Sequence, residues 1–182
     1  MGPRSVAIGD LNGDGRAVPA VANVTPSTVS VLLGNGTGGF GAKTDFATGL
    51  NPYSVAIGDV SGDGRPDLAV ANFGSNTVSV LLGIGAGSFG AKIDFTAGLN
   101  PHSIAVGDVN GDGKPDLAVA NYTPSTVSVL LGNGAGGFGA KTDFATGGSP
   151  QSVAIGDVSG DGRPDLAVAN TVDFTVSVLL GL

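Results

Sequence analysis

A unit of 49 residues repeats along the chain, and this repeat restricts the possible folds more than any other feature. The hexapeptide Ser-Val-Ala-Ile-Gly-Asp begins at Ser5 and returns at Ser54, Ser103 (with Ile and Val exchanged) and Ser152, each start 49 residues after the one before. The 182 residues therefore hold three full units and a fourth that stops after 31 residues (182 − 152 + 1). A repeat of this length indicates an array of small structural units that stabilise one another by packing together.

Each unit contains short apolar runs separated by turn residues. In the third unit the runs cover residues 103–107, 117–121, 126–131 and 138–144. Runs of this length, rich in Val, Ile and Thr and bounded by Gly, Pro, Asn and Asp, are typical of β-strands. The composition agrees, because the chain has 33 glycines and its 15 acidic residues are all Asp, with none of the helix-favouring Glu.

Four strands in about 50 residues correspond to one blade of a β-propeller. We therefore predict an all-β protein, a β-propeller of four-stranded antiparallel blades that forms one repeat domain over residues 1–182. The predicted blades cover about 5–53, 54–102, 103–151 and 152–182, and the last lacks its outer strand. A parallel β-helix or solenoid is the main alternative, but its repeats are usually shorter, with one strand on each side.

Composition excludes several classes of protein. A hydrophobic content of 41% is enough for a buried core, whereas the longest apolar runs are too short for membrane insertion. No apolar leader follows the N-terminus, so this chain shows no signal peptide. The absence of Cys excludes disulfides and thiolate metal sites. A net charge of −7 argues against nucleic-acid binding and suits a protein that binds cations.

The turn after the first run of each unit concentrates acidic side chains. In the third unit this turn reads Asp-Val-Asn-Gly-Asp-Gly-Lys-Pro-Asp over residues 108–116. Positions 1, 3, 5 and 9 carry side-chain oxygens, position 7 adds a backbone carbonyl, and Ca²⁺ prefers such an all-oxygen ligand set. The predicted calcium ligands are Asp59, Ser61, Asp63, Arg65 and Asp67; Asp108, Asn110, Asp112, Lys114 and Asp116; and Asp157, Ser159, Asp161, Arg163 and Asp165.

The first turn departs from this pattern, because Val18 occupies the place of the ninth-position Asp. We therefore predict weaker or absent calcium binding there, at Asp10, Asn12, Asp14 and Arg16. The alternative for all four turns is that they are ordinary Asp-Gly hairpin turns without metal. Three complete copies at a fixed spacing favour calcium over that alternative.

The motif Asp-Val-Asn-Gly-Asp-Gly-Lys-Pro-Asp-Leu-Ala-Val-Ala-Asn, followed by Val-Ser-Val-Leu-Leu-Gly and Phe-Gly, resembles the FG-GAP/VCBS repeat over essentially the whole chain. Such repeats form the propellers of integrin α chains, of some calcium-dependent fungal and bacterial lectins and of many large bacterial surface proteins. The resemblance implies calcium between the first two strands of each blade and a place outside the cell or on its surface, and we expect a bacterial source. It leaves the ligand open, because the repeat serves structural, adhesive and sugar-binding proteins alike.

The number of blades suggests self-association. Propellers have about four to eight blades, and this chain encodes fewer than four complete ones. We favour self-association, and a homodimer that completes an eight-blade ring would cover both open ends. A four-blade ring in one chain, and a fragment or subunit of a larger open array, remain open. The last apolar run, 175–180, would lack a partner strand and present an edge for association.

Variable positions between the second and third strands are the candidate ligand contacts. Phe73, Tyr122 and Phe174 could stack on sugar rings or anchor a surface protein, or they could cover neighbouring blades. His102, the only histidine, is expected on an exposed loop or rim without a catalytic role. We expect a non-enzymatic, calcium-binding structural or adhesion scaffold. The alternative is a calcium-dependent lectin with sugar sites between blades.

Overall fold

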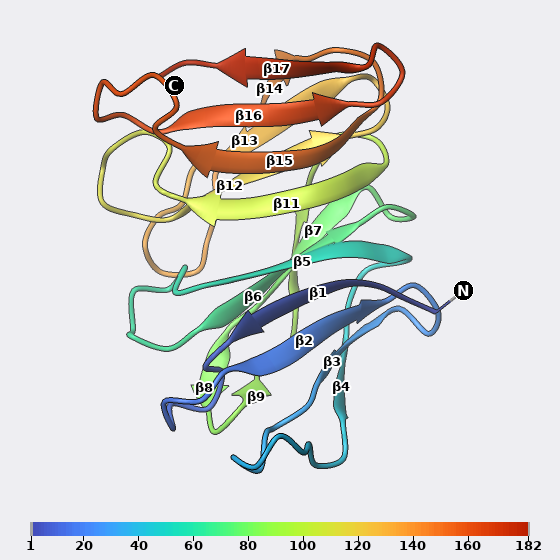
Figure 1. The fold of residues 1–182 in the computed structure, drawn as a ribbon, viewed down its shortest axis with the longest axis vertical. Coiled ribbons are helices and arrows are strands. Elements are labelled where there is room, and N and C mark those ends of the chain that lie inside the picture. Colours follow the sequence, from blue (N-terminus) through green and yellow to red (C-terminus); the bar gives the residue numbers. More distant parts are fainter. Residues whose placement is uncertain (1, 182) are drawn as a thin grey trace.

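The computed structural model describes residues 2–181. Met1 and Leu182, the last residue of the predicted fourth blade, lie outside the described residues. The chain is all-β, as predicted, and consists of antiparallel sheets that follow one another in sequence order (Figure 1). Between residues 2 and 181 no helix is long and apolar enough to cross a membrane.

Each blade repeats the same succession of strands, which we name by their position in the blade. The inner strands are β1 (Pro3–Gly9), β5 (Pro52–Gly58), β11 (Pro101–Gly107) and β15 (Pro150–Gly156). The second strands are β2 (Val18–Asn23), β6 (Asp67–Asn72), β12 (Asp116–Asn121) and β16 (Asp165–Asn170). The third strands are β3 (Thr28–Val31), β7 (Thr77–Leu81), β13 (Thr126–Leu130) and β17 (Thr175–Leu179). The outer strands are β4 (Thr44–Ala47), β10 (Ile93–Thr96) and β14 (Thr142–Ala145).

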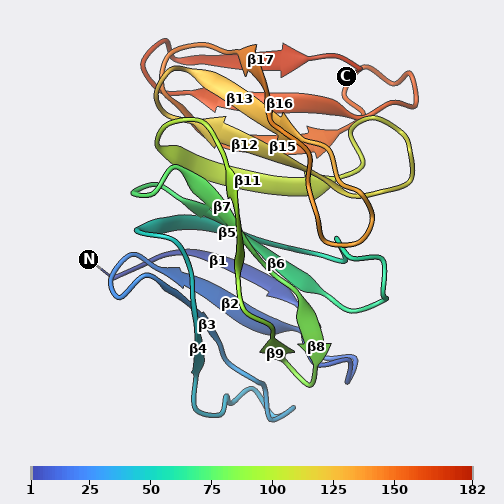
Figure 2. The same cartoon turned by 180° about the vertical axis from the view of Figure 1, so that it is seen from behind.

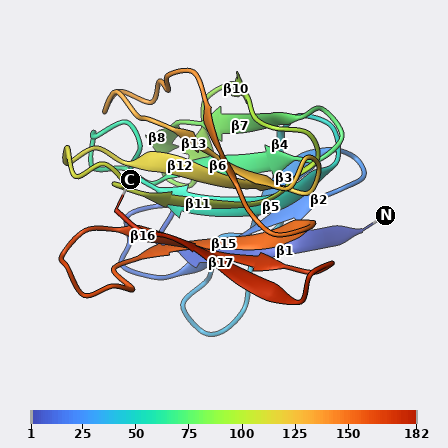
Figure 3. The ribbon, with the colours of Figure 1, turned by 90° about the horizontal axis from the view of Figure 1, so that it is seen from above.

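The four sheets pack face to face in chain order, and the inner strands of neighbouring blades lie next to one another. Figures 1 and 2 show the first and last sheets at opposite ends of this array, and Figure 3 looks along it. Three hydrophobic clusters fill the three spaces between the four sheets. The cores therefore lie between blades rather than within them, as expected of a propeller.

This arrangement explains the continuous apolar sequence of the second strands. Every residue of β6 and β12 is buried, because a neighbouring sheet covers each of their faces. In β2, at one end of the array, buried residues alternate with partly exposed ones, because only one face is covered. The same Val-Ala pattern thus gives two burial patterns, and the position of the blade in the array decides which one appears.

The outer part of each blade differs from the prediction. The run 138–144 was expected to form one strand, but β14 begins only at Thr142, and Phe138 instead forms an isolated bridge with Gly132. In the second blade the same region forms a small hairpin of β8 (Gly83–Gly85) and β9 (Ser88–Phe89). The Gly-rich loop bends toward the preceding blade, where Gly136 N donates to Val60 O at 3.0 Å. That contact between blades interrupts the strand.

A polar chain crosses each complete blade and was not predicted. In the third blade Asn121 Nδ2 donates to Ser128 Oγ at 2.8 Å, and Ser128 Oγ donates to Asp143 Oδ1 at 2.6 Å. Lys141 then pairs with the other oxygen of Asp143. The pKa of Asp143 is lowered: burial acts to raise it, and the hydrogen bonds from Lys141 and Ser128 outweigh that effect. These contacts tie the outer strand to β13 and β12.

Candidate metal centre

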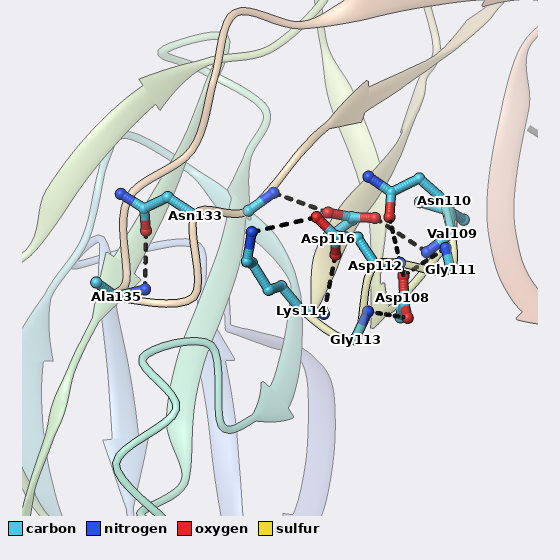
Figure 4. Close-up of polar contacts among 11 residues, drawn as sticks. Asp108, Val109, Asn110, Gly111, Asp112, Gly113, Lys114, Asp116, Asn133 and Ala135 are labelled. Atoms are coloured by element: carbon cyan, nitrogen blue, oxygen red, sulfur yellow. Dashed lines mark hydrogen bonds and ion pairs between the residues drawn. The ribbon is translucent and has the colours of Figure 1, made fainter.

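The predicted metal loop of the third blade, residues 108–116, is held by its first aspartate (Figure 4). Asp108 Oδ1 accepts hydrogen bonds from Gly111 N at 2.7 Å and Asp112 N at 3.1 Å, and Oδ2 accepts one from Gly113 N at 2.7 Å. Gly113 has a φ of +82°, a conformation that glycine adopts without steric cost. The carboxylate therefore lies inside the turn, surrounded by backbone N–H groups.

The side chains at positions 3 and 5 also point into the loop. Asn110 Oδ1 accepts from Asp112 N at 2.9 Å, and Asp112 Oδ1 accepts from Lys114 N at 2.9 Å. The hydrogen bond from the Lys114 amide is the main reason that the pKa of Asp112 is lowered. Lys114 Nζ lies 3.4 Å from Asp112 Oδ2, so a cationic side chain already neighbours this carboxylate.

The ninth-position Asp116 has a different role, because it lies buried beneath the loop at the start of β12. Its Oδ2 accepts from Val109 N at 3.0 Å and its Oδ1 accepts from Gly132 N at 2.7 Å. Burial raises the pKa of Asp116 despite these hydrogen bonds, and the negative charge of Asp112 raises it further. The side chain thus connects the metal loop to the segment that follows β13.

The second and fourth loops repeat this connection. Asp67 accepts from Val60 N and Gly83 N, and Asp165 accepts from Val158 N and Gly181 N. Burial raises the pKa of Asp67, as it does for Asp116. The pKa of Asp165 is instead lowered, chiefly by the hydrogen bond from Gly181, and the hydrogen bonds to this carboxylate outweigh the opposite effect of its burial.

The first loop keeps the turn but lacks the connection beneath it. Asp10 accepts from the backbone amides of residues 12–15, and its pKa is lowered, chiefly by the hydrogen bond from Gly15. Val18, in the place of the ninth-position Asp, is 1% exposed and belongs to the hydrophobic core between the first two blades. An apolar side chain therefore fills the space that a carboxylate occupies in the other three loops.

The loops supply the all-oxygen donors that calcium prefers, but the acidic side chains are not gathered around one point. Among the residues that the structure describes, no three His, Cys, Asp or Glu side chains form a group that could hold a metal ion. The reason is visible in the third loop, where Asp108 accepts from amides within the turn and Asp116 accepts from amides beneath it. The calcium ligand set therefore stays a prediction. The aspartate at position 9 departs most from the predicted ligand arrangement, because it lies beneath the turn.

Clefts separate the loops of neighbouring blades. One, of about 400 Å³, lies between the third and fourth loops, with Asn110 on one side and Arg163 on the other. A second, of about 230 Å³, lies between the first and second loops, with Asn12 and Arg65 on its sides. Backbone from the Gly-rich turns forms much of both linings.

At the opposite ends of the inner strands, aromatic side chains from successive blades lie together. Tyr53 stacks on Phe73 with ring centroids 4.4 Å apart, and Arg4 lies over the ring of Tyr53 with its Cζ 4.3 Å from the ring centroid. The ring of His102 lies 5.3 Å from Tyr53 and 6.2 Å from Tyr122. We call Arg4, Tyr53, Phe73, His102 and Tyr122 the aromatic row.

The structure unites two of the three predicted aromatic contacts and corrects the place of the histidine. Phe73 and Tyr122 belong to the aromatic row, whereas Phe174 is 94% exposed in the last blade. The expectation that His102 occupies an exposed loop or rim was wrong, because it lies within β11 and is partly buried against these rings. Sequence analysis missed Arg4 and Tyr53, although both occupy the position equivalent to His102 in their own units.

The comparisons with known proteins agree with this architecture. A family model described as the FG-GAP-like repeat matches residues 20–70, 59–119 and 108–168. No curated protein sequence matches the chain. An Agrocybe aegerita lectin that recognises non-reducing terminal N-acetylglucosamine has a similar structure, with a TM-score of 0.63 and 23% identity over 89% of this chain and 45% of the lectin.

Two bacterial structures are similar to the same extent. The biofilm matrix protein of V. cholerae matches with a TM-score of 0.60 and 18% identity over 96% of this chain and 26% of that protein. An auxiliary nutrient binding protein of Bacteroides ovatus matches with a TM-score of 0.63 and 9% identity over 98% of this chain and 45% of that protein. This chain thus spans less than half the length of each of these three proteins, and the likeness to them concerns the fold.

Proposed function

The chain belongs to the FG-GAP-like repeat family, and we propose that it is a non-enzymatic, calcium-binding β-propeller that acts as a structural or adhesion scaffold outside the cell or on its surface. The observation that carries this proposal is the acidic loop, which is complete in three blades and occupies the same place in each. In the third blade the ligands would be Asp108, Asn110, Asp112, the carbonyl of Lys114 and Asp116.

Electrostatics supports a cation at this place. The charge of Asp112 raises the pKa of the buried Asp116, so these two of the three carboxylates of the loop repel each other. Oδ1 of Asp116 accepts one backbone hydrogen bond, from Gly132 N, and keeps a lone pair for a second partner. Calcium, when bound, would supply positive charge that offsets this repulsion. The residues of the chain hold the loop in shape and link it to the end of β13.

Calcium dependence of stability tests the proposal. We expect EDTA to lower the melting temperature of the whole chain and added Ca²⁺ to restore it, because a ligand that binds only the folded state stabilises that state. Asp112→Asn should remove part of this calcium-dependent gain, whereas Asp143→Asn, outside the loops, should leave it intact. Identical melting curves in EDTA and in millimolar Ca²⁺ would reject the proposal.

The surroundings of His102 support a role without catalysis. Its Nε2 lies 3.2 Å from Arg4 Nη2, and its Nδ1 lies 3.1 Å from Gln151 O. Both ring nitrogens therefore have partners in the protein, and a general base needs one nitrogen within reach of a substrate proton.

A carbohydrate-binding function is the second candidate, and the aromatic row favours it. Its residues differ between units that are otherwise nearly identical, and Tyr122 keeps 36% of its surface exposed beside the ring of His102. An aromatic face next to polar groups suits a sugar ring. Calorimetric titration with a panel of monosaccharides tests this function. Tyr122→Ala should abolish any binding found, and Phe174→Ala, in the last blade, is the matched control.

A further inference from the structure

The contacts between neighbouring blades repeat with the period of the sequence, and the chain shows two series of them three times and a third series twice. The last glycine of each of the first three inner strands faces an aliphatic side chain of the next blade, and an added Cβ would lie about 3 Å from it. These pairs are Gly9 with Ile57 (3.2 Å), Gly58 with Val106 (2.7 Å) and Gly107 with Ile155 (3.2 Å). The absence of a side chain on the glycine is what admits the neighbour.

The fourth pair of this series is not formed within the described residues, and its two members lie at opposite ends of the array. A Cβ on Gly156 would meet nothing within 4 Å. Ile8, which occupies in the first blade the place of Ile57, Val106 and Ile155 in the others, is 70% exposed. The last blade therefore presents the hollow of this contact, and the first blade presents the side chain that fits it.

A second series of contacts is interrupted in the same way. A backbone N–H of each inner strand donates to a serine of the preceding blade, at 3.3–3.4 Å. The donors are Val55, Ile104 and Val153, and the acceptors are Ser5, Ser54 and Ser103. Val6 is the equivalent donor in the first blade, and Ser152 is the equivalent acceptor in the fourth blade. Within the described residues these two form no such pair, because they lie at opposite ends of the array. Val6 is 58% exposed, whereas Val55, Ile104 and Val153 are each 6% exposed.

A third series joins the Gly-rich loops to the preceding blade. Gly136 N donates to Val60 O, and a Cβ on Gly136 would lie 2.7 Å from Leu82 Cδ2. In the repeat, Gly38 of the first blade is equivalent to Gly136, and Val158 and Leu180 of the fourth blade are equivalent to Val60 and Leu82. Gly38 lies at the opposite end of the array from Val158 and Leu180, so the chain does not make this contact with itself. Val60 is 1% exposed and Val158 is 60% exposed, because the fourth blade lacks a successor within residues 2–181.

We propose that a second copy of this chain docks its first blade onto the fourth blade and makes the fourth example of this interface. Ile8 of the second copy would lie against Gly156, Val6 would donate to Ser152, and Gly38 would approach Val158 and Leu180. Such a head-to-tail contact uses two different surfaces. Two copies that make it in both directions form a closed ring and cover both ends.

The complementarity of the two end faces argues that the partner is a second copy of this chain rather than an unrelated protein. The two end faces are repeat-equivalents of surfaces that already pack together three times within the chain, so their shape and polar groups match by construction. Exposed apolar side chains lie on both faces: Val6 and Ile8 on the first blade, and Val158, Val176, Val178 and Leu180 on the last. Contiguous exposed apolar surface of this kind marks an interaction site.

Cysteine cross-linking tests the contact directly, because the chain has no native cysteine. At the three internal pairs, the Cβ built on the glycine lies 3.4–3.9 Å from the Cβ of the facing residue, which suits a disulfide. We expect a mixture of the Ile8→Cys and Gly156→Cys chains to form a covalent dimer under mild oxidation, and neither chain to do so alone. Gly9→Cys with Ile57→Cys in one chain is the positive control for folding and oxidation.

The assembly itself gives an independent measurement. Light scattering of the unmodified chain should give the mass of two chains, and larger species with the same cross-link would support the contact in an open array. Gly156→Val meets nothing in its own chain but blocks Ile8 of the second copy, so this variant should be a folded monomer. Ile84→Lys, which changes an exposed residue on β8 of the second blade, should still associate.

Three results would overturn the proposal. The first is a monomer for the unmodified chain at all concentrations. The second is no cross-link in the mixture while the Gly9 and Ile57 control forms its disulfide. The third is association that Gly156→Val leaves unchanged, because this would assign the interface to another surface. If the chain is a monomer whose end faces bind a different protein, this result also overturns the proposal, because the unmodified chain is then a monomer.

Discussion

The guanidinium of Arg4 donates a hydrogen bond to Nε2 of His102 at 3.2 Å, although the two residues lie 98 positions apart in the sequence. This distance is two repeats, so the contact joins the first blade to the third across Tyr53 of the second. Arginine can only donate, so Nε2 must accept and the proton of the neutral ring lies on Nδ1. Nδ1 then donates to Gln151 O in the fourth blade, 3.1 Å away.

We expect the pKa of His102 to lie below its ordinary value of 6.5, because burial disfavours the charged ring and the charge of Arg4 adds to this effect. Since the folded-state pKa is the lower one, the unfolded chain binds the proton more tightly. The contribution of His102 to the free energy of unfolding is therefore fully present above pH 6.5. It is lost as the pH drops from 6.5 to the folded-state pKa.

An NMR titration of the single histidine measures this pKa directly. Arg4→Gln should raise it, because the substitution removes the nearby positive charge. Arg163→Gln, in the metal loop of the fourth blade at the other end of the inner strands, is the matched control and should leave it unchanged. A value at or above 6.5 in the unmodified protein would contradict the expectation.

Asp116→Ala should destabilise the chain even without metal. The change leaves the amides of Val109 and Gly132 without their acceptor, and loss of two hydrogen bonds to a buried carboxylate costs about 2–4 kcal/mol. Urea unfolding in EDTA measures this loss apart from any effect of calcium. Asp112→Ala, in the exposed part of the same loop, should cost clearly less by comparison. Equal losses in the two variants would show that Asp116 does not link the loop to β13.

Val18→Asp should create a fourth calcium site. The substitution places a carboxylate where Asp67, Asp116 and Asp165 lie in the other loops, next to the turn that Asp10 already holds. Calorimetry should find three tight sites in the unmodified chain and four in the variant. In EDTA the variant should be less stable, because Val18 belongs to the core between the first two blades.

Val18→Asn, which offers an amide oxygen without the charge, is the control and should give a weaker fourth site. Four equivalent tight sites in the unmodified chain would contradict the reasoning about the first loop. So would a stoichiometry that stays at three in the aspartate variant, provided that the variant is folded in calcium.

Ser128→Ala should cost about 2 kcal/mol of the free energy of unfolding, because the buried hydroxyl both accepts from Asn121 and donates to Asp143. Ser177 is its equivalent in the fourth blade, where it accepts from Asn170 and Gly147 N but donates to no such aspartate, because the described residues of this blade include no outer strand. Ser177→Ala should therefore cost less. Denaturant unfolding of the two variants makes the comparison, and a larger loss at Ser177 would contradict this account of the polar chain.

Most strands of the blades follow from sequence pattern, and the exceptions have a common cause. The run 117–121 forms β12 within one residue of its predicted start, because its alternation and its flanking turns are local signals. The run 138–144 does not form a single strand, because Gly136 binds the preceding blade. No pattern within a unit contains that partner.

The candidate site divides in the same way. The positions and types of the loop residues can be read from the repeat, and so can the departure at Val18. The orientation of Asp116 toward Gly132 N depends on how β12 and β13 pack, so the structure was needed to find it. The aromatic row depends on residues of three different blades, and the sequence pointed toward it only through positions that vary between units, such as those of Phe73 and Tyr122.

By itself the sequence determines the repeat, the strands of each blade and the acidic turns, because these depend on periodicity and turn chemistry within about 50 residues. Only the tertiary structure decided which carboxylates face the turn and which lie beneath it, how the aromatic row forms, and which surfaces remain open. The physical reason is that these features arise between blades, from contacts such as Gly107 with Ile155 and Arg4 with His102. Identical local sequences then differ in burial and pKa according to whether another blade covers them.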